Sequence, residues 1–397
     1  MISKALISLM YDAASINRWN DHIRPWTGFT ELDKQAHKMI YAYVLSKCEG
    51  GGVDNIKLIE GGIFEFFHRI ILTDIKPPIY HKLVKEKGDQ INAWVLDTLK
   101  DDLTKIGGGF YERMCRYYGE PDYADLEKRI LKAAHYLASD WEFRVIYPLN
   151  QQTYGIEQVK EDMAKGLASC DNFSGYRYFT GSSYLNRFMS IIGKLRYQQR
   201  WSKAVRLPNT FVMGHMLVVA ILSYFSVLEL DEPCRKRREN SFFSGLFHDL
   251  AESLTRDIVS PVKSSVSGLG AIISGIEAEQ MDEVIYPLLP EEWHGKIRYY
   301  TENEFASKII ENGEIKDVTS DLINEKYNFD EYDPLDGQIV RCCDRLSAYI
   351  EAYMSISYGV KSEQIVSGYN NLSGEYKNKV IGGINFGELF GYFKEDA

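Results

Sequence analysis

The stretch that decides the fold is Gly245-Leu246-Phe247-His248-Asp249-Leu250-Ala251-Glu252-Ser253, in which three polar residues interrupt an apolar run of helical character. His248 and Glu252 stand four residues apart, a spacing that places two side chains on one face of a helix. Burying a histidine, an aspartate and a glutamate together costs free energy unless their polar groups are compensated. A bound metal ion is the first candidate, so the stretch predicts a metal site inside a helical core.

Two further polar side chains stand inside apolar helical segments of the second half. His215 lies in Met-Gly-His-Met-Leu-Val-Val-Ala, and Asp344 lies in Val-Arg-Cys-Cys-Asp-Arg-Leu-Ser-Ala-Tyr. With the His248-Asp249 pair they form a set of two imidazoles and two carboxylates. Such a mixed set suits Mn, Fe, Co, Ni or Zn better than Ca, and helix-borne ligands build such sites in all-α cores. Taken alone, His215 is equally well interpreted as a hydrogen-bonded core histidine.

Helical periodicity dominates the chain as a whole. Apolar positions recur at three- and four-residue spacing, and long alternating strand patterns are absent. The sequence therefore predicts an all-α fold. The expected helices cover 1–20, 31–48, 60–72, 90–106, 124–145, 156–168, 183–203, 211–230, 238–254, 265–287 and 337–358. Residues 294–336 are acid-rich and weakly patterned, and we interpret them as an insertion with some helix.

Composition narrows the class of protein. A chain of 397 residues is long enough for two domains. A net charge of -10 argues against a nucleic-acid-binding protein, which needs a basic face. Six cysteines without a C-x-x-C pair disfavour a disulfide framework and favour a reducing cytoplasm. The most apolar run, 213–230, includes His215 and Glu229, so we interpret it as a buried helix and expect no membrane association.

The two halves of the chain share short motifs in the same order. Asn17-Arg18-Trp19 matches Gln199-Arg200-Trp201, and Gly62-Ile63-Phe64 matches Gly245-Leu246-Phe247. Residues 132–138 align further on with 341–347. These matches predict an internal duplication, with one domain over 1–150 and the second over 151–397.

The order H…HD…D resembles the metal-dependent phosphohydrolases of the HD-domain superfamily. The resemblance is closest to the YfbR-like 5′-deoxynucleotidases, in which an Arg-Trp pair precedes the first histidine and the motif reads approximately H-D-x-x-E-x-L-T-x-D. Residues 248–257 read His-Asp-Leu-Ala-Glu-Ser-Leu-Thr-Arg-Asp, followed by Pro261-Val262-Lys263, and the last aspartate begins Asp344-Arg345-Leu346-Ser347-Ala348-Tyr349. The resemblance covers about 183–290 and 337–360 and implies two tandem HD-type helical domains.

This resemblance implies a role for each motif residue. The bound ion would lower the pKa of a bound water and neutralise phosphoryl oxygens, and Glu252 would transfer a proton. Arg200 offers donors that match a phosphate, Trp201 offers a flat wall for a sugar or base, and Asp257 is implied near the ribose. A structural Glu252–Arg256 pair, a solvated Arg200 and a capping role for Asp257 are the alternatives. The metal ligands would be His215, His248, Asp249 and Asp344.

The first half departs from the motif. Gapless alignment places Glu65 and Phe66 at the His-Asp positions and His135 at the last ligand, and we expect His37 at the first-histidine position. We interpret this half as a degenerate copy that supplies packing surface, with a regulatory nucleotide at Arg18-Trp19 as the alternative. A fused pair would reproduce within one chain the dimer formed by the related enzymes, so we expect a monomeric pseudo-dimer or a homodimer.

The function expected from these residues is removal of phosphate from a small phosphorylated metabolite, above all a (deoxy)nucleoside 5′-monophosphate. A nucleoside triphosphate or alarmone hydrolase is one alternative, because several basic residues lie near Arg200. A nucleotide-sensing protein that uses the HD pocket for binding without turnover is another. The products and the presence of turnover distinguish the three.

Overall fold

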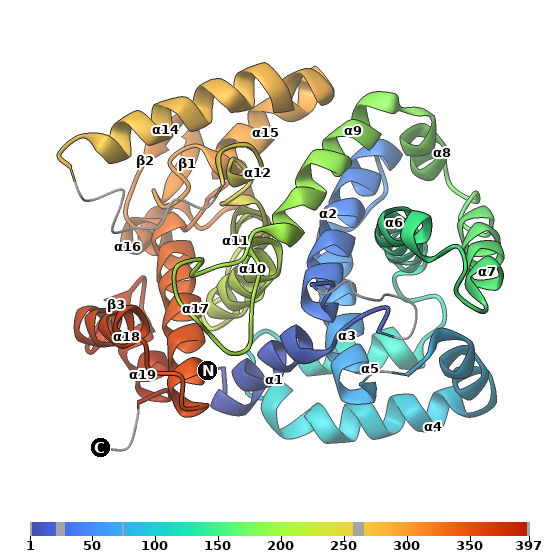
Figure 1. The fold of residues 1–397 in the computed structure, drawn as a ribbon. Coiled ribbons are helices and arrows are strands. Elements are labelled where there is room, and N and C mark those ends of the chain that lie inside the picture. The colour runs from blue at the N-terminus through green and yellow to red at the C-terminus, as the bar shows by residue number, and fades with distance from the viewer. Residues whose placement is uncertain (1, 21–27, 74, 257–265, 395–397) are drawn as a thin grey trace. The chain divides into compact units, whose positions relative to one another are not determined.

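The chain folds almost entirely into helices, as the computed structural model in Figure 1 shows. The structure describes residues 2–20, 28–73, 75–256 and 266–394, and the strands in these ranges form two small two-stranded sheets. The all-α fold class is therefore confirmed. Within the same ranges, no helix is both long and apolar enough to cross a membrane.

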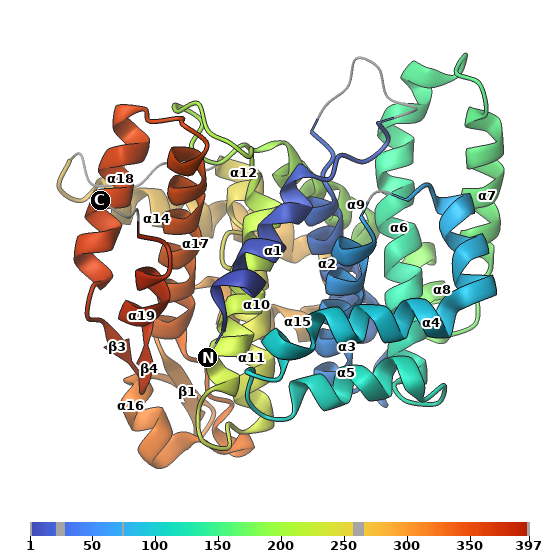
Figure 2. The same ribbon diagram turned by 90° about the horizontal axis from the view of Figure 1, so that it is seen from below.

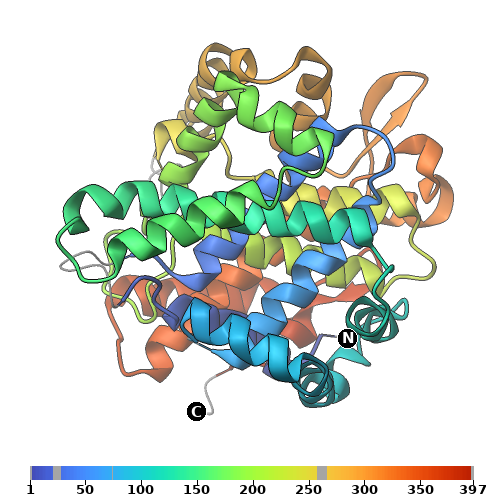
Figure 3. The same cartoon turned by 90° about the vertical axis from the view of Figure 1, so that its right-hand side faces the viewer.

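Two compact units make up the chain, unit 1 from Met1 to Ser182 and unit 2 from Ser183 to Ala397. Unit 1 is built around α2 (Glu31–Glu49), which is buried from Glu31 to Ser46 and packs against α3, α6 and α8. α4 and α5 lie side by side in Figure 2, and α7 runs alongside α6 in Figure 3. The helices are α1 (Lys4–Ser15), α2, α3 (Asn55–Leu72), α4 (Pro77–Leu103), α5 (Phe110–Gly119), α6 (Asp125–Asn150), α7 (Ile156–Ala168) and α8 (Ser174–Gly181).

The compact units divide at 182–183, whereas the sequence pattern placed a domain boundary at 150–151. The difference arises because α7 packs against α6 and α8 packs against α2, so both helices join the first core. A glutamate helps to hold α8 there, since Glu49 accepts a hydrogen bond of 2.8 Å from the hydroxyl of Ser174. The assignment of domains within the chain stays a prediction.

Unit 2 surrounds one apolar helix, α10 (Val212–Leu228), in which every residue is buried. α11 (Arg235–Phe247) and α17 (Gly337–Ser357) pack against it. Before them come α9 (Ser183–Ile192) and a 3₁₀ turn at Gly193–Tyr197. The remaining helices and strands are α12 (Glu252–Thr255), α14 (Leu269–Gln280), α15 (Glu291–Thr301), β1 (Lys308–Glu311), β2 (Glu314–Asp317), α16 (Ser320–Leu322), α18 (Glu363–Tyr376), β3 (Val380–Ile381), β4 (Ile384–Asn385) and α19 (Phe386–Gly391).

A glycine allows α11 to approach α10 closely. A Cβ atom at Gly245 would lie 2.7 Å from the Cα of Ala220, which is closer than real side chains come. The absence of a side chain therefore lets the two backbones touch. This contact brings the end of α11, where His248 follows, beside the first turn of α10, which holds His215.

The predicted insertion over 294–336 contains more than helix. Its β1 and β2 form an antiparallel hairpin with Lys308 opposite Asp317 and Glu311 opposite Glu314. Ile309 of β1 is buried with Ile323 and Tyr327 in a small core of its own. The strands are four residues long, and β2 is fully exposed, so this hairpin leaves little alternation in the sequence to detect.

Candidate metal centre

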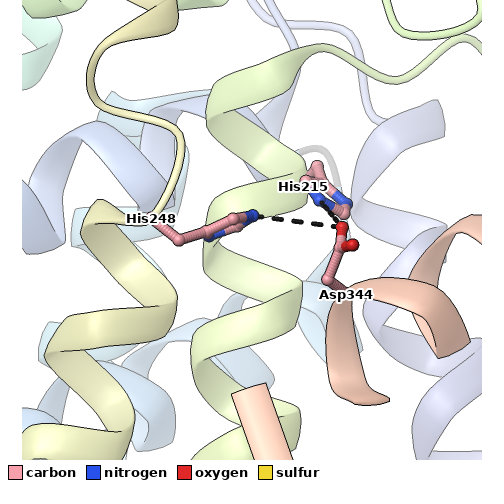
Figure 4. A group of neighbouring side chains, drawn as sticks. All are labelled: His215, His248 and Asp344. Carbon is pink, nitrogen blue, oxygen red and sulfur yellow. Dashed lines mark hydrogen bonds and ion pairs between the residues drawn. The ribbon is translucent and has the colours of Figure 1, made fainter. Parts of the chain in front are cut away.

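Three helices of unit 2 bring two histidines and an aspartate together, as Figure 4 shows. His215 comes from the first turn of α10, His248 follows the last residue of α11, and Asp344 lies in the second turn of α17. Nε2 of His215 lies 3.0 Å from Oδ1 of Asp344, and Nε2 of His248 lies 4.0 Å from the same oxygen. One ligand atom from each residue falls within 4.8 Å of the others.

Asp249, the fourth predicted ligand, faces the same centre. Its Oδ2 lies 3.1 Å from Nε2 of His248 and 3.9 Å from Nε2 of His215. Ligand atoms bound to one ion at about 2.1 Å sit roughly 3–4 Å from one another, so these separations fit a shared ion. The donor set of imidazole nitrogens and carboxylate oxygens fits a divalent transition metal, although the arrangement itself does not select one.

The histidines are oriented by their second ring nitrogens. Nδ1 of His248 donates to the carbonyl of Gly245 at 2.8 Å, which turns Nε2 toward the carboxylates. Nδ1 of His215 lies 2.9 Å from the hydroxyl of Ser347 on α17. Such partners fix ring orientation in metal sites. Both imidazoles therefore present Nε2 to the centre without rearrangement.

Burial and charge move the pKa values of these groups in different directions. Burial lowers the pKa of His215, and the nearby Arg200 adds to that effect. Burial also disfavours the charged form of His248, but Asp249 and Asp344 outweigh it and raise the pKa of His248 to about 9. Burial works against ionisation of Asp344 as well, yet the two histidines hold the pKa of this carboxyl below its usual range. The centre is thus strongly anionic at its carboxylates.

The helix predicted over 238–254 ends inside the motif. α11 stops at Phe247, and the next residues form tight turns in which the N–H of Glu252 donates to the carbonyl of Asp249 at 3.1 Å. Turns with this three-residue spacing do not keep residues i and i+4 on one face. The expected common helix face of His248 and Glu252 is therefore wrong. The break instead lets the adjacent His248 and Asp249 both face the centre.

Glu252 begins the short helix α12 and is buried. Its backbone carbonyl accepts a hydrogen bond of 2.8 Å from the side chain of Gln198. The proton-transfer role of this carboxyl stays a prediction. Asp257, the residue expected near the ribose, and Pro261-Val262-Lys263 lie outside the described residues.

The Arg200-Trp201 pair stands beside the centre in the connection between the 3₁₀ turn and α10. Nη1 of Arg200 lies 4.0 Å from Oδ2 of Asp249. Both side chains also donate to one buried carboxylate, Glu351 of α17, from Nε of Arg200 at 3.2 Å and from Nε1 of Trp201 at 2.9 Å. The pair is therefore held between the candidate metal ligands and a fixed acidic anchor.

Glu351 was missed by the sequence reasoning. It is fully buried and also accepts a hydrogen bond of 2.6 Å from the hydroxyl of Thr210. The sequence did contain a signal for Glu351, because this residue follows Asp344 by seven positions and so shares one face of α17 with Asp344. A lone glutamate on the apolar face of a helix needs partners. The Arg-Trp pair supplies them.

Unit 1 repeats this anchor. Nε of Arg18 donates to Glu142 at 2.9 Å, and Nε1 of Trp19 donates to the same carboxylate at 2.6 Å. Trp19 and Trp201 both have positive φ, 60° and 56°. An antiparallel bridge encloses the pair in each unit, with Asn17 joined to Thr30 and Gln199 joined to Phe211.

The metal-ligand positions of unit 1 hold a different set of side chains. In register with the bridges, Lys34 takes the place of His215, and its Nζ lies 2.5 Å from Nδ1 of His135. Glu65 accepts a hydrogen bond of 2.6 Å from Tyr117 and pairs with Lys38. His37, expected at the first-histidine position, instead contacts the rings of Tyr41 and Trp141. A lysine amine therefore stands where unit 2 has an imidazole.

Comparison with known families agrees with the geometry of unit 2. A family model described as HD domain matches residues 192–373, from the end of α9 to α18. Unit 2 is therefore similar to HD domains over this stretch. HD domains generally bind divalent metals and hydrolyse phosphate esters, and the match includes His215, His248, Asp249 and Asp344. No curated protein matches the chain.

Proposed function

We propose that the HD domain of unit 2 is a phosphohydrolase that removes phosphate from (deoxy)nucleoside 5′-monophosphates. The observation that carries the proposal is the approach of Arg200 to within 4.0 Å of Asp249 beside the clustered histidines and carboxylates. A guanidinium next to a metal centre matches a phosphate bound to both. The adjacent Trp201 offers an aromatic surface for the rest of a nucleotide.

Each group of the centre has a distinct proposed role. His215, His248, Asp249 and Asp344 would hold the divalent ion, which supplies an acidified water and charge neutralisation when bound. Arg200 orients the phosphate and stabilises the charge that develops on its oxygens. Glu252, buried on the turn after the ligands, would hold or deliver the proton exchanged with water or the leaving oxygen.

The arrangement favours a monophosphate over a triphosphate or alarmone substrate. Longer phosphate chains require additional cations, and Arg196 and Arg206 were two candidates for that role. Both are buried, with 0% and 1% exposure, and Arg206 hydrogen-bonds to Thr210 beside Glu351. Their burial counts against direct contacts with a longer phosphate chain, whereas Lys203 and Arg256, the other two basic candidates, are exposed.

Unit 1 is proposed to be a degenerate copy of the same scaffold without a metal site. The shared Arg-Trp-Glu anchor, the matching bridges and the common positive φ support the duplication. The Lys34–His135 contact and the Lys38–Glu65 pair support the loss of the ion, because lysine amines stand among the positions of its ligands. Unit 1 would then serve as packing surface in a monomeric pseudo-dimer or a homodimer.

A product assay tests the proposed activity. Protein loaded separately with Mn²⁺, Co²⁺ or Zn²⁺ is incubated with nucleoside mono-, di- and triphosphates, and inorganic phosphate, pyrophosphate and triphosphate are separated. We expect nucleoside and inorganic phosphate from monophosphates, and loss of turnover in Asp344→Ala. Pyrophosphate or triphosphate as the main product would replace the proposal by the triphosphatase alternative. Nucleotide binding without any turnover would favour a sensing protein.

A further inference from the structure

Glu351 occupies a position from which one carboxylate controls two predicted substrate contacts. Its Oε2 accepts hydrogen bonds from Nε of Arg200 and Nε1 of Trp201, and its Oε1 accepts one from Thr210. The side chain is fully buried. A buried carboxylate with charged and neutral donors holds its partners in a narrow range of orientations.

The far edge of the Trp201 indole is also confined, by the backbone of α18 at Gly368. A Cβ atom at Gly368 of α18 would lie 2.7 Å from the Cη2 atom of the Trp201 indole and 3.0 Å from its Cζ3. The ring is therefore set between a hydrogen bond at Nε1 and the bare backbone of α18. An alanine at this position would push directly against the indole.

In unit 1 the tryptophan of the same Arg-Trp-Glu anchor is packed among apolar side chains. Trp19 packs against Phe143 in a tilted arrangement, at a centroid separation of 5.8 Å, and belongs to an apolar cluster. The position that aligns with Phe143, one residue after the anchoring glutamate, is Ala352 in unit 2. The ring that packs Trp19 is thus replaced at the aligned position of unit 2 by an alanine.

The arginine of the pair also differs between the two units, in its acidic partners. Nη1 of Arg18 donates to the buried Glu31 at 2.8 Å, so two carboxylates neutralise this guanidinium. The position that aligns with Glu31 is Val212, because the N–H groups of Glu31 and Val212 donate to the matching carbonyls of Ile16 and Gln198. Unit 2 keeps the anchoring carboxylate, and its second carboxylate near the guanidinium is Asp249, 4.0 Å from Nη1 of Arg200.

We propose that Glu351 is a positioning residue that orients Arg200 and Trp201 toward the substrate. Gly368 sets the position of the Trp201 indole and thereby the preference for a substrate that carries a nucleoside. The inference rests on the proposed phosphohydrolase function. Glu351 acts on both recognition groups, whereas Gly368 acts on the indole alone. Substitutions at the two sites should therefore differ in their effects on KM for a nucleotide and on KM for a phosphate ester without a nucleoside.

The experiment compares Glu351→Gln and Gly368→Ala with two matched controls. Gly374→Ala lies on the same helix but its added Cβ meets nothing within 4 Å, and Glu142→Gln removes the equivalent carboxylate of unit 1. Each protein is assayed for kcat and KM on a nucleoside 5′-monophosphate and on phenyl phosphate. The bound metal is quantified, and the indole N–H resonance of Trp201, assigned by its loss in Trp201→Phe, is recorded.

We expect Gly368→Ala to raise KM for the nucleotide about tenfold, the scale of one lost stacking contact, with kcat, metal content and KM for phenyl phosphate unchanged. Glu351→Gln should raise KM for both esters and shift the Trp201 resonance, while both controls behave as wild type. Unchanged constants and an unchanged resonance in Glu351→Gln, or a Gly368→Ala protein that matches Gly374→Ala, would overturn the proposal.

The outcomes separate this inference from the proposed function. If wild-type protein hydrolyses neither ester, the proposed activity fails, and the Trp201 resonance in Glu351→Gln alone decides whether the carboxylate positions the indole. If Glu351→Gln does not fold, the comparison of Gly368→Ala with Gly374→Ala decides the specificity claim.

Discussion

The amine of Lys34 lies 2.5 Å from Nδ1 of His135, at the place where unit 2 sets Nε2 of His215 3.0 Å from Oδ1 of Asp344. In unit 1 a lysine amine therefore contacts an uncharged imidazole, since burial holds the pKa of Lys34 well below its usual range, and burial and then Lys34 do the same to the pKa of His135. In unit 2 two imidazoles and the guanidinium of Arg200 face two carboxylates, and this set of nitrogen and oxygen donors suits a divalent ion. The asymmetry predicts one metal ion for the two units.

Substitution of Arg18 by alanine tests the structural role of unit 1. Arg18 joins the buried carboxylates Glu31 and Glu142, so its removal takes a guanidinium from Glu142 and leaves Glu31 with Arg69 at 3.6 Å, which should lower the free energy of unfolding by about 3–5 kcal/mol. Urea unfolding measures the change. Metal content and kcat of the folded protein should stay at wild-type values. Lost activity with unchanged stability would instead favour a nucleotide bound at Arg18-Trp19.

Substitution of Gly245 by alanine tests the contact between α10 and α11. The new Cβ would meet the backbone of Ala220 at 2.7 Å and force the helices apart, which should cost about 1–3 kcal/mol of stability. Because His248 follows α11, metal affinity should fall as well. Gly275→Ala on α14, where a Cβ meets nothing within 4 Å, is the control. Equal metal affinity and stability in the two variants would contradict this account.

Metal binding should depend on pH through His248. Its pKa is raised to about 9 in the metal-free protein, so the imidazole must lose a proton to bind an ion at neutral pH. The apparent affinity should rise about tenfold per pH unit from roughly pH 7 toward 9, with about one proton released. Calorimetry in buffers of different ionisation enthalpy measures both. An affinity that does not change between these pH values would contradict the prediction.

The metal-free protein should show the opposite trend in stability. A histidine whose pKa is higher in the folded state contributes stability that is fully present below its unfolded pKa, about 6.5, and is lost as the pH rises through about 9. Thermal unfolding with and without metal distinguishes the two effects. A metal-free protein that gains stability over this range from His248, judged against His248→Ala, would be inconsistent with the carboxylate contacts.

The sequence contained enough to predict the centre but not its supporting geometry. The polar positions inside apolar helices identified His215 and Asp344, and the periodic pattern identified the helices that bring them together. The end of α11 at Phe247 was missed because the apolar pattern continues across it to Leu250. His37 was expected at the first-histidine position because it is a histidine, although the register of the bridges aligns Lys34 with His215. The pairing of Lys34 with His135 depends on tertiary contacts that spacing does not encode.

One metal centre in unit 2 is proposed to perform the hydrolysis, and metal analysis combined with phosphate release tests this proposal most directly. Wild-type protein, His248→Ala and the control His294→Ala, whose histidine contacts the carbonyl of Leu289, are loaded with a divalent ion and assayed on nucleoside monophosphates. We predict about one ion per chain and phosphate release in wild type and His294→Ala, and loss of both in His248→Ala. Metal content and phosphate release that persist in His248→Ala would contradict the account.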